Sequence, residues 1–308
     1  GQSGNLAWYG AADWFAEDGW RAHSPSLARQ LFGKLSYRDG QGDLDLALSR
    51  ARSRLTGNGL VPESMLAQGR AEVFTHPDQT RNDLTQVTVN GRYWLGDASS
   101  LTGTVYHRRS ATRTLNGDLD DDFAGGPFDG VANTDSGVHN RTRTRQRGSG
   151  GALQWNLATA SQQLAVGAAV DRATLDFSQT AEVGVIDAGR GVGALAPALT
   201  LNALAGSTVT RSLYATHTTG LGPLWHLTVA ARYNASRVVT HDQLRPAPPN
   251  LDGDHAYRKL NPALGLTWQA LPTVDVYAGF SQGNRVPTPV ELGCADAANP
   301  CTLPNALA

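Results

Sequence analysis

The chain has 308 residues, of which 40% are hydrophobic and 17% are charged, values within the globular range. A formal net charge of -1 and an isoelectric point near 6.8 argue against the overall basic character expected of a nucleic-acid-binding protein. No stretch approaches the roughly 18 consecutive apolar residues of a membrane-spanning helix, so a helical membrane protein is excluded as well.

Apolar and polar residues alternate with period two along most of the chain, and helical periodicity is nearly absent. Such alternation is typical of β-strands with two different faces. We therefore predict an all-β protein with eleven strands, at Asn5–Phe15, Leu27–Arg38, Asp43–Arg54, Asp83–Leu95, Ser99–Thr112, Arg147–Ala158, Gln162–Leu175, Val209–Thr219, Pro223–Val239, Ala256–Gln269 and Thr273–Asn284.

The connections between these segments alternate between short and long. The short ones are residues 39–42, 96–98, 159–161, 220–222 and 270–272, and the long ones are 16–26, 55–82, 113–146, 176–208, 240–255 and everything after 285. Barrels of bacterial outer membranes have short periplasmic turns and long extracellular loops. The pattern therefore predicts a transmembrane antiparallel β-barrel, since a soluble sandwich does not require short and long connections to alternate strictly.

Eleven strands use up the whole chain, whereas barrels that keep long loops and bind large ligands have about 22 strands around a plugged lumen. We therefore expect residues 1–308 to be about half of a barrel, with both ends arbitrary cuts. The first five residues also show no signal peptide. Such a piece would expose two unpaired edges and is not expected to be stable alone.

One face of each predicted strand could meet lipid, as in the series Val87, Val89, Gly91, Tyr93 and Leu95. The opposite face carries polar residues, as a hydrated or plug-filled lumen requires. Aromatic residues next to the short turns suit an interfacial girdle. The inward positions yield candidates for contact with an anionic ligand or, for most of them, with plug carboxylates: Asn90, Arg92, Arg108, Arg232 and Asn234.

Arginines recur at the long-loop ends of the strands, at positions that point to the same side as the apolar face. A guanidinium fork suits phosphate, so we expect contact with lipopolysaccharide, the leading candidates being Arg29, Arg52, Arg109, Arg172, Arg211 and Arg237. The alternative is that any hydrophilic residue suits this height. Because Lys34 and Lys259 are the only lysines, that residue would then be arginine by default.

Cys294 and Cys301 lie close together in a Pro- and Asn-rich stretch, which fits a short-loop disulfide in an oxidising compartment. A zinc site would need two more ligands, which no nearby histidine supplies. A nucleophile elbow, a phosphate-binding glycine loop and an HExxH helix are not found. We predict no catalytic residue, no metal site and no cofactor.

Several segments resemble TonB-dependent receptors. ADWFAEDGWRAHSPS (residues 12–26) followed by RQLFGKLSYR (29–38) resembles an early barrel hairpin of that family, and GNGLVPESML (57–66) is similar to its next extracellular loop. The most specific segments are YRKLNPALGLTW (257–268), VYAGFSQGNRVPTPVEL (276–292) and CADAANPCTLPN (294–305), which are similar to a mid-barrel region with a Cys-closed loop.

The resemblance implies an outer-membrane receptor with a 22-stranded barrel, an N-terminal plug and uptake powered by the TonB complex. Residues 1–308 would be a partial barrel domain, with the plug, the TonB-contacting N-terminal segment and the C-terminal strands outside it. The expected function is binding an external ligand, a ferric siderophore by family base rate, and not enzymatic catalysis. Expected partners are the TonB complex, the receptor's own plug, lipopolysaccharide and outer-membrane lipid. The alternatives are a passive outer-membrane pore and a soluble β-rich adhesin or carbohydrate-binding domain.

Overall fold

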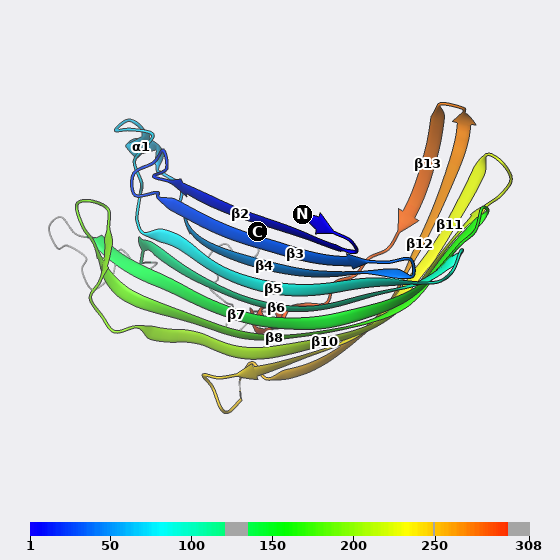
Figure 1. Cartoon of the computed structure of the whole chain (residues 1–308). Coiled ribbons are helices and arrows are strands. Elements are labelled where there is room, and N and C mark those ends of the chain that lie inside the picture. Colours follow the sequence, from blue (N-terminus) through cyan, green and yellow to red (C-terminus); the bar gives the residue numbers. More distant parts are fainter. Residues whose placement is uncertain (121–134, 249, 295–308) are drawn as a thin grey trace.

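A single curved antiparallel sheet makes up nearly all of the computed structural model, which describes residues 1–120, 135–248 and 250–294 (Figure 1). Its strands are β1 (Gln2–Ser3), β2 (Leu6–Glu17), β3 (Ser26–Arg38), β4 (Gly42–Thr56), β5 (Asp78–Gly96), β6 (Ser99–Leu119), β7 (Asp135–Ala158), β8 (Gln162–Ile186), β9 (Val192–Ala194), β10 (Leu199–Gly220), β11 (Trp225–Asp242), β12 (Gly253–Leu271) and β13 (Val274–Ser281). Two short helices complete it, α1 (Glu63–Leu66) and α2 (Pro289–Cys294).

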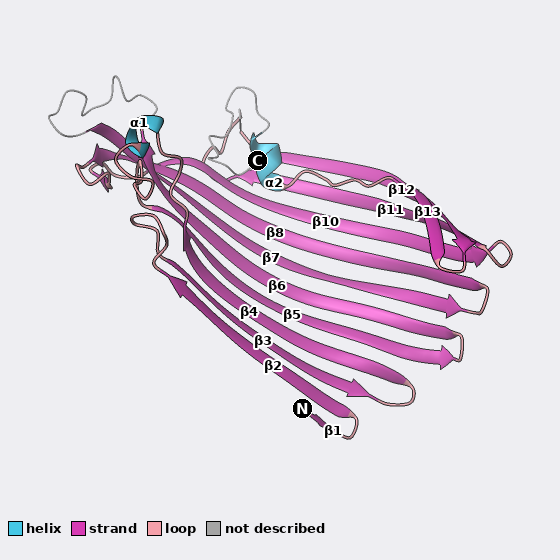
Figure 2. Ribbon diagram, turned by 90° about the horizontal axis from the view of Figure 1, so that it is seen from above, coloured by secondary structure: helices cyan, strands magenta, loops and turns pink. Residues whose placement is uncertain are grey.

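The strands follow one another in chain order as an up-and-down meander, except that the short β9 pairs with β8 beside the main path. Neighbours are joined alternately by tight turns at one end and long connections at the other (Figure 2). This confirms the predicted all-β antiparallel architecture. Among the described residues, no helix is long and apolar enough to span a membrane.

The eleven predicted strands correspond to β2–β8 and β10–β13, but the middle strands are much longer than predicted. The predicted loops 113–146 and 176–208 are in large part strand, because β6, β7, β8 and β10 continue well past the apolar segments. These extensions are held by polar cross-strand pairs such as the Thr114 and Thr142 hydroxyls, 2.6 Å apart. A ladder needs backbone hydrogen bonds and no apolar face, so hydropathy alternation underestimates its length.

The last predicted strand is also wrong at its end, because β13 stops at Ser281 and not at Asn284. From there the chain leaves the sheet edge and runs as a segment we call the strap (residues 282–294) toward the long-loop end. The strap ends in α2, which lies against β10 and β11 (Figure 2). Consequently β12 is paired with β13 only from Ala263 onward.

Strand register divides the sheet into two faces of different chemistry. One cross-strand row reads Val89, Val105, Gly151, Val170, Arg211 and Ala235, and the adjacent row reads Asn90, Thr104, Ala152, Ala169, Ser212 and Asn234. Since neighbouring residues of a strand point to opposite sides, the first row belongs to what we call the outer face and the second to the inner face. The strap packs on the inner face.

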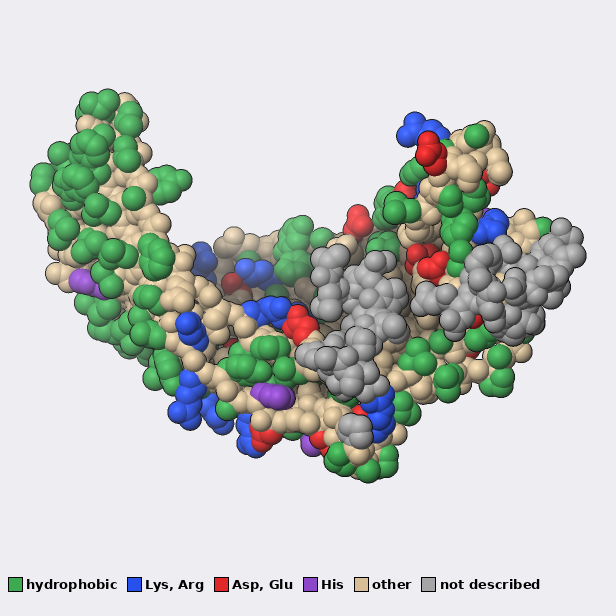
Figure 3. Space-filling model, turned by 180° about the vertical axis from the view of Figure 1, so that it is seen from behind, with side chains coloured by type: hydrophobic (Ala, Val, Ile, Leu, Met, Phe, Trp, Pro, Cys, Tyr) green, Lys and Arg blue, Asp and Glu red, His purple; other side chains and the backbone are tan. Residues whose placement is uncertain are grey.

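The outer face is apolar and uncovered over its short-turn half. Val105, Leu153 and Leu213 are 62%, 58% and 64% exposed, and the stacked rings of Trp225 and Trp268 lie near the short turns with centroids 5.3 Å apart. Hydrophobic side chains cover the arm formed by the hairpins of β11–β13, and basic side chains appear farther along the sheet (Figure 3). An apolar surface of this extent is typical of contact with lipid or a partner.

A small cluster of buried hydrophobic residues lies on the inner face under the strap. Leu175, Phe177 and Leu204 form its centre, with Leu251 and Val290 packed against them. The strap is therefore anchored by apolar burial at its far end and by polar contacts along its length.

Candidate functional site on the inner face

Arg232 is the centre of a hydrogen-bond network on the inner face of β10 and β11. Its Nε donates to Asn234 Oδ1 at 3.0 Å, and its Nη2 donates to Ser212 Oγ at 2.9 Å. The Ser212 hydroxyl in turn donates to Asn234 Oδ1 at 2.9 Å. The guanidinium lies 5.2 Å from the ring centroid of Tyr214, within cation–π range. The positive charge is thus held in one orientation.

A second polar pair stands beside this network. The Tyr106 hydroxyl donates to Asp171 Oδ1 at 2.8 Å, joining β6 to β8 across β7. The residue between them is Gly150, where a Cβ atom would lie 2.6 Å from the Tyr106 ring and overlap the Asp171 carboxylate. Tyr214 covers Gly167 in the same way. Glycines on β7 and β8 therefore let both aromatic rings lie flat against the sheet.

These groups surround a cavity of about 180 Å³ lined by Thr104, Tyr106, Gly151, Ala152, Ala169, Asp171, Tyr214 and Arg232. It offers one cation, one carboxylate and two aromatic rings. We call this lining the inner wall. It can contact an anionic or aromatic ligand, or the polar surface of another domain.

The strap adds amide groups to this wall. Asn284 Oδ1 accepts hydrogen bonds from Asn261 Nδ2 at 2.7 Å and from Asn234 Nδ2 at 3.3 Å, and the Gln282 amide donates to the Pro262 carbonyl at 3.0 Å. A pocket of about 460 Å³ lies between the strap and Arg232. Asn234 thus links the Arg232 network to the strap.

An ion pair stiffens the strap beyond this point. Arg285 donates to both carboxylate oxygens of Glu291, at 2.6 and 2.8 Å, and the Thr288 amide donates to Glu291 at 2.7 Å. The Arg285 hydrogen bonds, followed by that of the Thr288 amide, lower the pKa of the Glu291 carboxyl to about 2.

We expect strap order to depend on pH through Glu291. Because its pKa falls from an ordinary 4.5 to about 2 on folding, its contribution is complete above pH 4.5 and is lost as the pH falls through 2. The protection factors of the strap amides, which correct for the pH dependence of intrinsic exchange, should therefore fall over this window in the whole receptor. Glu291→Gln should show lower protection factors at neutral pH and no such window, and constant wild-type protection across it would contradict the assignment.

We expect Gly206→Val to release the strap. Gly206 lies on the inner face of β10, and an added Cβ would overlap the Pro289 ring. Limited proteolysis should cut residues 282–294 about 5- to 150-fold faster than in wild type, as a destabilisation of about 1–3 kcal/mol predicts. Gly33→Val, where the space is open, is the matched control. Equal cleavage of the two variants would show that α2 is not held by this contact.

The five inward-facing candidates all lie on the inner face, but the structure brings only Arg232 and Asn234 together. Asn90 accepts a hydrogen bond from Thr104 at 2.9 Å, and Arg92 lies over the Trp94 ring near the short-turn end. Arg108 makes no hydrogen bond or ion pair with any described residue. The wall also includes Tyr106, Asp171, Tyr214, Asn261 and Asn284, which sequence reasoning missed. The alternation of side chains along each strand marks the first four as inward-facing, so it could have identified them.

The six lipopolysaccharide candidates all lie on the outer face, with different partners. Arg29 stacks on Trp14, its guanidinium 4.2 Å from the ring centroid. Arg52 and Arg237 are ion-paired with Asp83 and Asp254, and Arg109 donates to His107 at 3.1 Å. Arg172 and Arg211 have no hydrogen bond or ion pair with a described residue. Because several of these arginines already contact other side chains of the protein, only some of them are available to an external anion.

Two further predictions concern metal ligation and a disulfide. Within the described ranges, no group of three or more His, Cys, Asp or Glu residues is placed to hold a metal ion. Cys294 ends α2, but Cys301 lies outside the described residues. The Cys294–Cys301 disulfide therefore stays a prediction.

Comparison with known proteins agrees with this geometry. The family profile described as TonB dependent receptor-like, beta-barrel, matches residues 8–305. The chain belongs to this family, whose members are transport receptors of the bacterial outer membrane and not enzymes. That membership argues against the soluble β-rich adhesin or carbohydrate-binding alternative. No curated protein sequence matches significantly.

Solved structures of the same fold include three transport proteins. The siderophore receptor PiuA from Acinetobacter baumannii has a TM-score of 0.72 at 12% identity, with 90% of this chain and 45% of that chain covered. The ferric-catecholate import receptor Fiu from E. coli K12 gives 0.69 at 12% identity, covering 91% and 50%. The copper transporter OprC gives 0.64 at 12% identity, covering 92% and 41%. The chain therefore spans at most about half the length of these proteins.

Proposed function

We propose that this chain is the first part of the barrel of an outer-membrane receptor that binds a ferric siderophore for TonB-energised uptake into the periplasm. The observation that carries the proposal is the oriented, cationic and aromatic wall around Arg232 on the inner face. Many ferric siderophores are anionic and carry aromatic or carboxylate groups, which such a wall can contact. The fold shared with PiuA and Fiu supports this ligand class.

We propose that the whole receptor continues with further strands and contains a plug. The edge of β12 over Gly253–Pro262 has no strand partner among the described residues, and an open edge is not stable in lipid. A plug inside the closed barrel would meet the inner face, so Asn90, Arg92 and Arg108 are proposed plug contacts. The TonB complex would act through that plug and not through residues 1–308.

Transport of radioactive iron tests the proposal. Cells that lack the receptor gene are supplied with the whole receptor and offered ⁵⁵Fe bound to a catecholate, a hydroxamate or citrate. We expect uptake of at least one chelate that stops when TonB is removed. Uptake of small solutes that persists without TonB would identify a passive pore, and TonB-dependent growth on copper or vitamin B12 without iron uptake would overturn the ligand class.

A further inference from the structure

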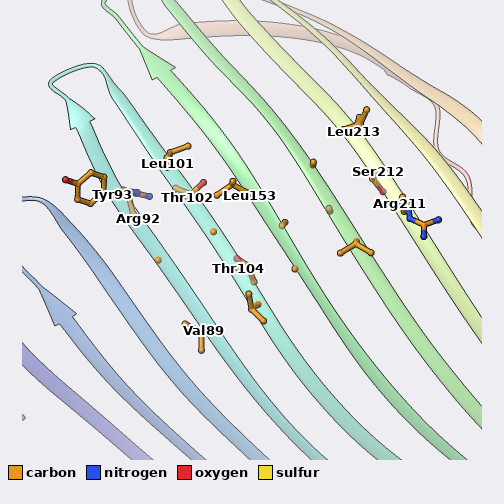
Figure 4. Close-up of a pocket in the computed structure, with 18 of the residues that line it drawn as sticks. Val89, Arg92, Tyr93, Leu101, Thr102, Thr104, Leu153, Arg211, Ser212 and Leu213 are labelled. Carbon is orange, nitrogen blue, oxygen red and sulfur yellow. The ribbon is translucent and has the colours of Figure 1, made fainter.

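A long apolar groove crosses the outer face between β4 and β11. It is an open depression with a volume of about 1220 Å³ and lies on the side of the sheet opposite the Arg232 network. Leu101, Leu153 and Leu213 rise along it from β6, β7 and β10, whereas Thr102, Thr104 and Ser212 point to the other side (Figure 4). The groove thus offers hydrocarbon contacts to whatever fills it.

Small residues create the groove. Gly91 and Gly103 are paired directly across β5 and β6, and Gly151 and Ala168 continue the floor on β7 and β8. A Cβ atom at Gly103 would meet only ordinary contacts at 3.7 and 3.8 Å. Glycine is therefore not required there by the backbone, and its absent side chain leaves a depression that a larger residue could fill.

Arginines gather at the long-loop end of this groove. Arg211 lines it, Arg172 lies one row farther out, opposite Ser149, and Arg109 and Arg147 face each other in the row beyond. At about 3.4 Å per residue, Arg147 lies roughly 14 Å from Gly151 along the strand. An apolar groove thus ends in a cluster of positive charge.

The described residues provide no counter-ion within this cluster. Arg147, Arg172 and Arg211 make no hydrogen bond or ion pair with any described residue, and the cross-strand rows that hold the four arginines contain no carboxylate between β5 and β11. The next row outward holds two carboxylates, Asp176, opposite Arg145, and Asp83, which is ion-paired with Arg50 and Arg52. Arg52 and Arg237, elsewhere on the same face, are ion-paired. Like charges opposite each other, as in Arg109 and Arg147, are destabilising without an anion between them.

We propose that the groove and Arg109, Arg147, Arg172 and Arg211 form a binding site for one lipopolysaccharide molecule of the outer leaflet. Acyl chains fill the groove, and a lipid A phosphate sits among the guanidinium groups, whose planar forks suit bidentate phosphate contact. The separation of roughly 14 Å places the phosphate above the acyl chains, as in a leaflet. The inference rests on the proposed membrane orientation but not on the transported ligand.

Native mass spectrometry of the whole receptor in detergent tests this site. The probes are hexa-acyl bisphosphorylated lipid A, its dephosphorylated form and phosphatidylglycerol. Gly103→Leu fills the groove, and Arg109→Gln/Arg147→Gln/Arg172→Gln removes three of the four positive charges. Gly33→Leu, at an open outer-face position, and Arg258→Gln, at an outer-face arginine, are the matched controls. Uptake of iron is measured in parallel for every variant.

We expect wild type and both controls to retain about one lipid A, and both test variants to bind it at least about tenfold more weakly. Dephosphorylated lipid A should bind to the wild-type receptor about as weakly as intact lipid A binds to the triple variant. Equal binding of phosphatidylglycerol, or unchanged binding in Gly103→Leu, would overturn the site. Because iron uptake has its own readout, loss of the lipid site with normal uptake, or the reverse, separates this inference from the proposed function.

Discussion

Leu153→Arg is expected to destabilise the membrane-embedded receptor by about 2–4 kcal/mol, the cost of an arginine on the lipid face near the bilayer midplane. Leu153 lies in the apolar short-turn half of the outer face of β7, between Gly151 and Trp155, and is 58% exposed. No described carboxylate lies in its cross-strand row to neutralise the charge. The measurement is denaturant unfolding of the whole receptor refolded into vesicles.

Gln154→Arg is the matched control for that substitution. It introduces the same side chain at the adjacent position, which faces the inner side and contacts Asn156. A hydrated or plug-filled lumen should tolerate it at a cost below about 1 kcal/mol, as surface substitutions usually do. Equal costs for the two variants would mean that the two faces meet the same medium, contrary to the barrel assignment.

Arg232→Met is expected to reduce ferric siderophore uptake by about 10- to 100-fold while leaving the barrel folded. One charge-assisted contact from Arg232 to an anionic ligand is worth about 1.5–3 kcal/mol, and each 1.4 kcal/mol corresponds to a factor of ten. Methionine keeps the apolar stem over Tyr214 but removes the cation and its hydrogen bonds. The initial rate of ⁵⁵Fe uptake is the readout.

Two further variants define what Arg232 does. Arg232→Lys keeps the charge without the planar fork and should give an intermediate rate. Arg258→Met makes the same kind of change on the outer face and should transport normally. Wild-type uptake by Arg232→Met, with the heat-modified gel mobility of a folded barrel, would show that this cation is not part of the transport path.

The fold could be predicted from the sequence because the two faces of a barrel meet different media. Alternation such as Val87, Val89 and Gly91 against Thr88 and Asn90 encodes both the strand and its orientation. The alternation weakens where the strands extend beyond the lipid and both faces meet water. For this reason the continuation of β6 to Leu119 and the start of β7 at Asp135 were missed.

The inner wall could be predicted only in part. Parity alone selects Arg232 and Asn234 as inward-facing residues. Their connection to Asn284 depends on the strap folding back from the sheet edge at Ser281, which alternation does not encode. The contact of Tyr106 with Asp171 similarly depends on the register of three strands and on the space left by Gly150.

The central claim is that the outer face meets lipid and the inner face does not. Single cysteines at Thr104, Val105, Ala152, Leu153, Ser212 and Leu213, in the whole receptor with Cys294 and Cys301 replaced by serine, carry a fluorophore into vesicles of brominated lipid. The account predicts strong quenching at Val105, Leu153 and Leu213 and weak quenching at their three neighbours. Quenching that does not alternate with residue parity would contradict it.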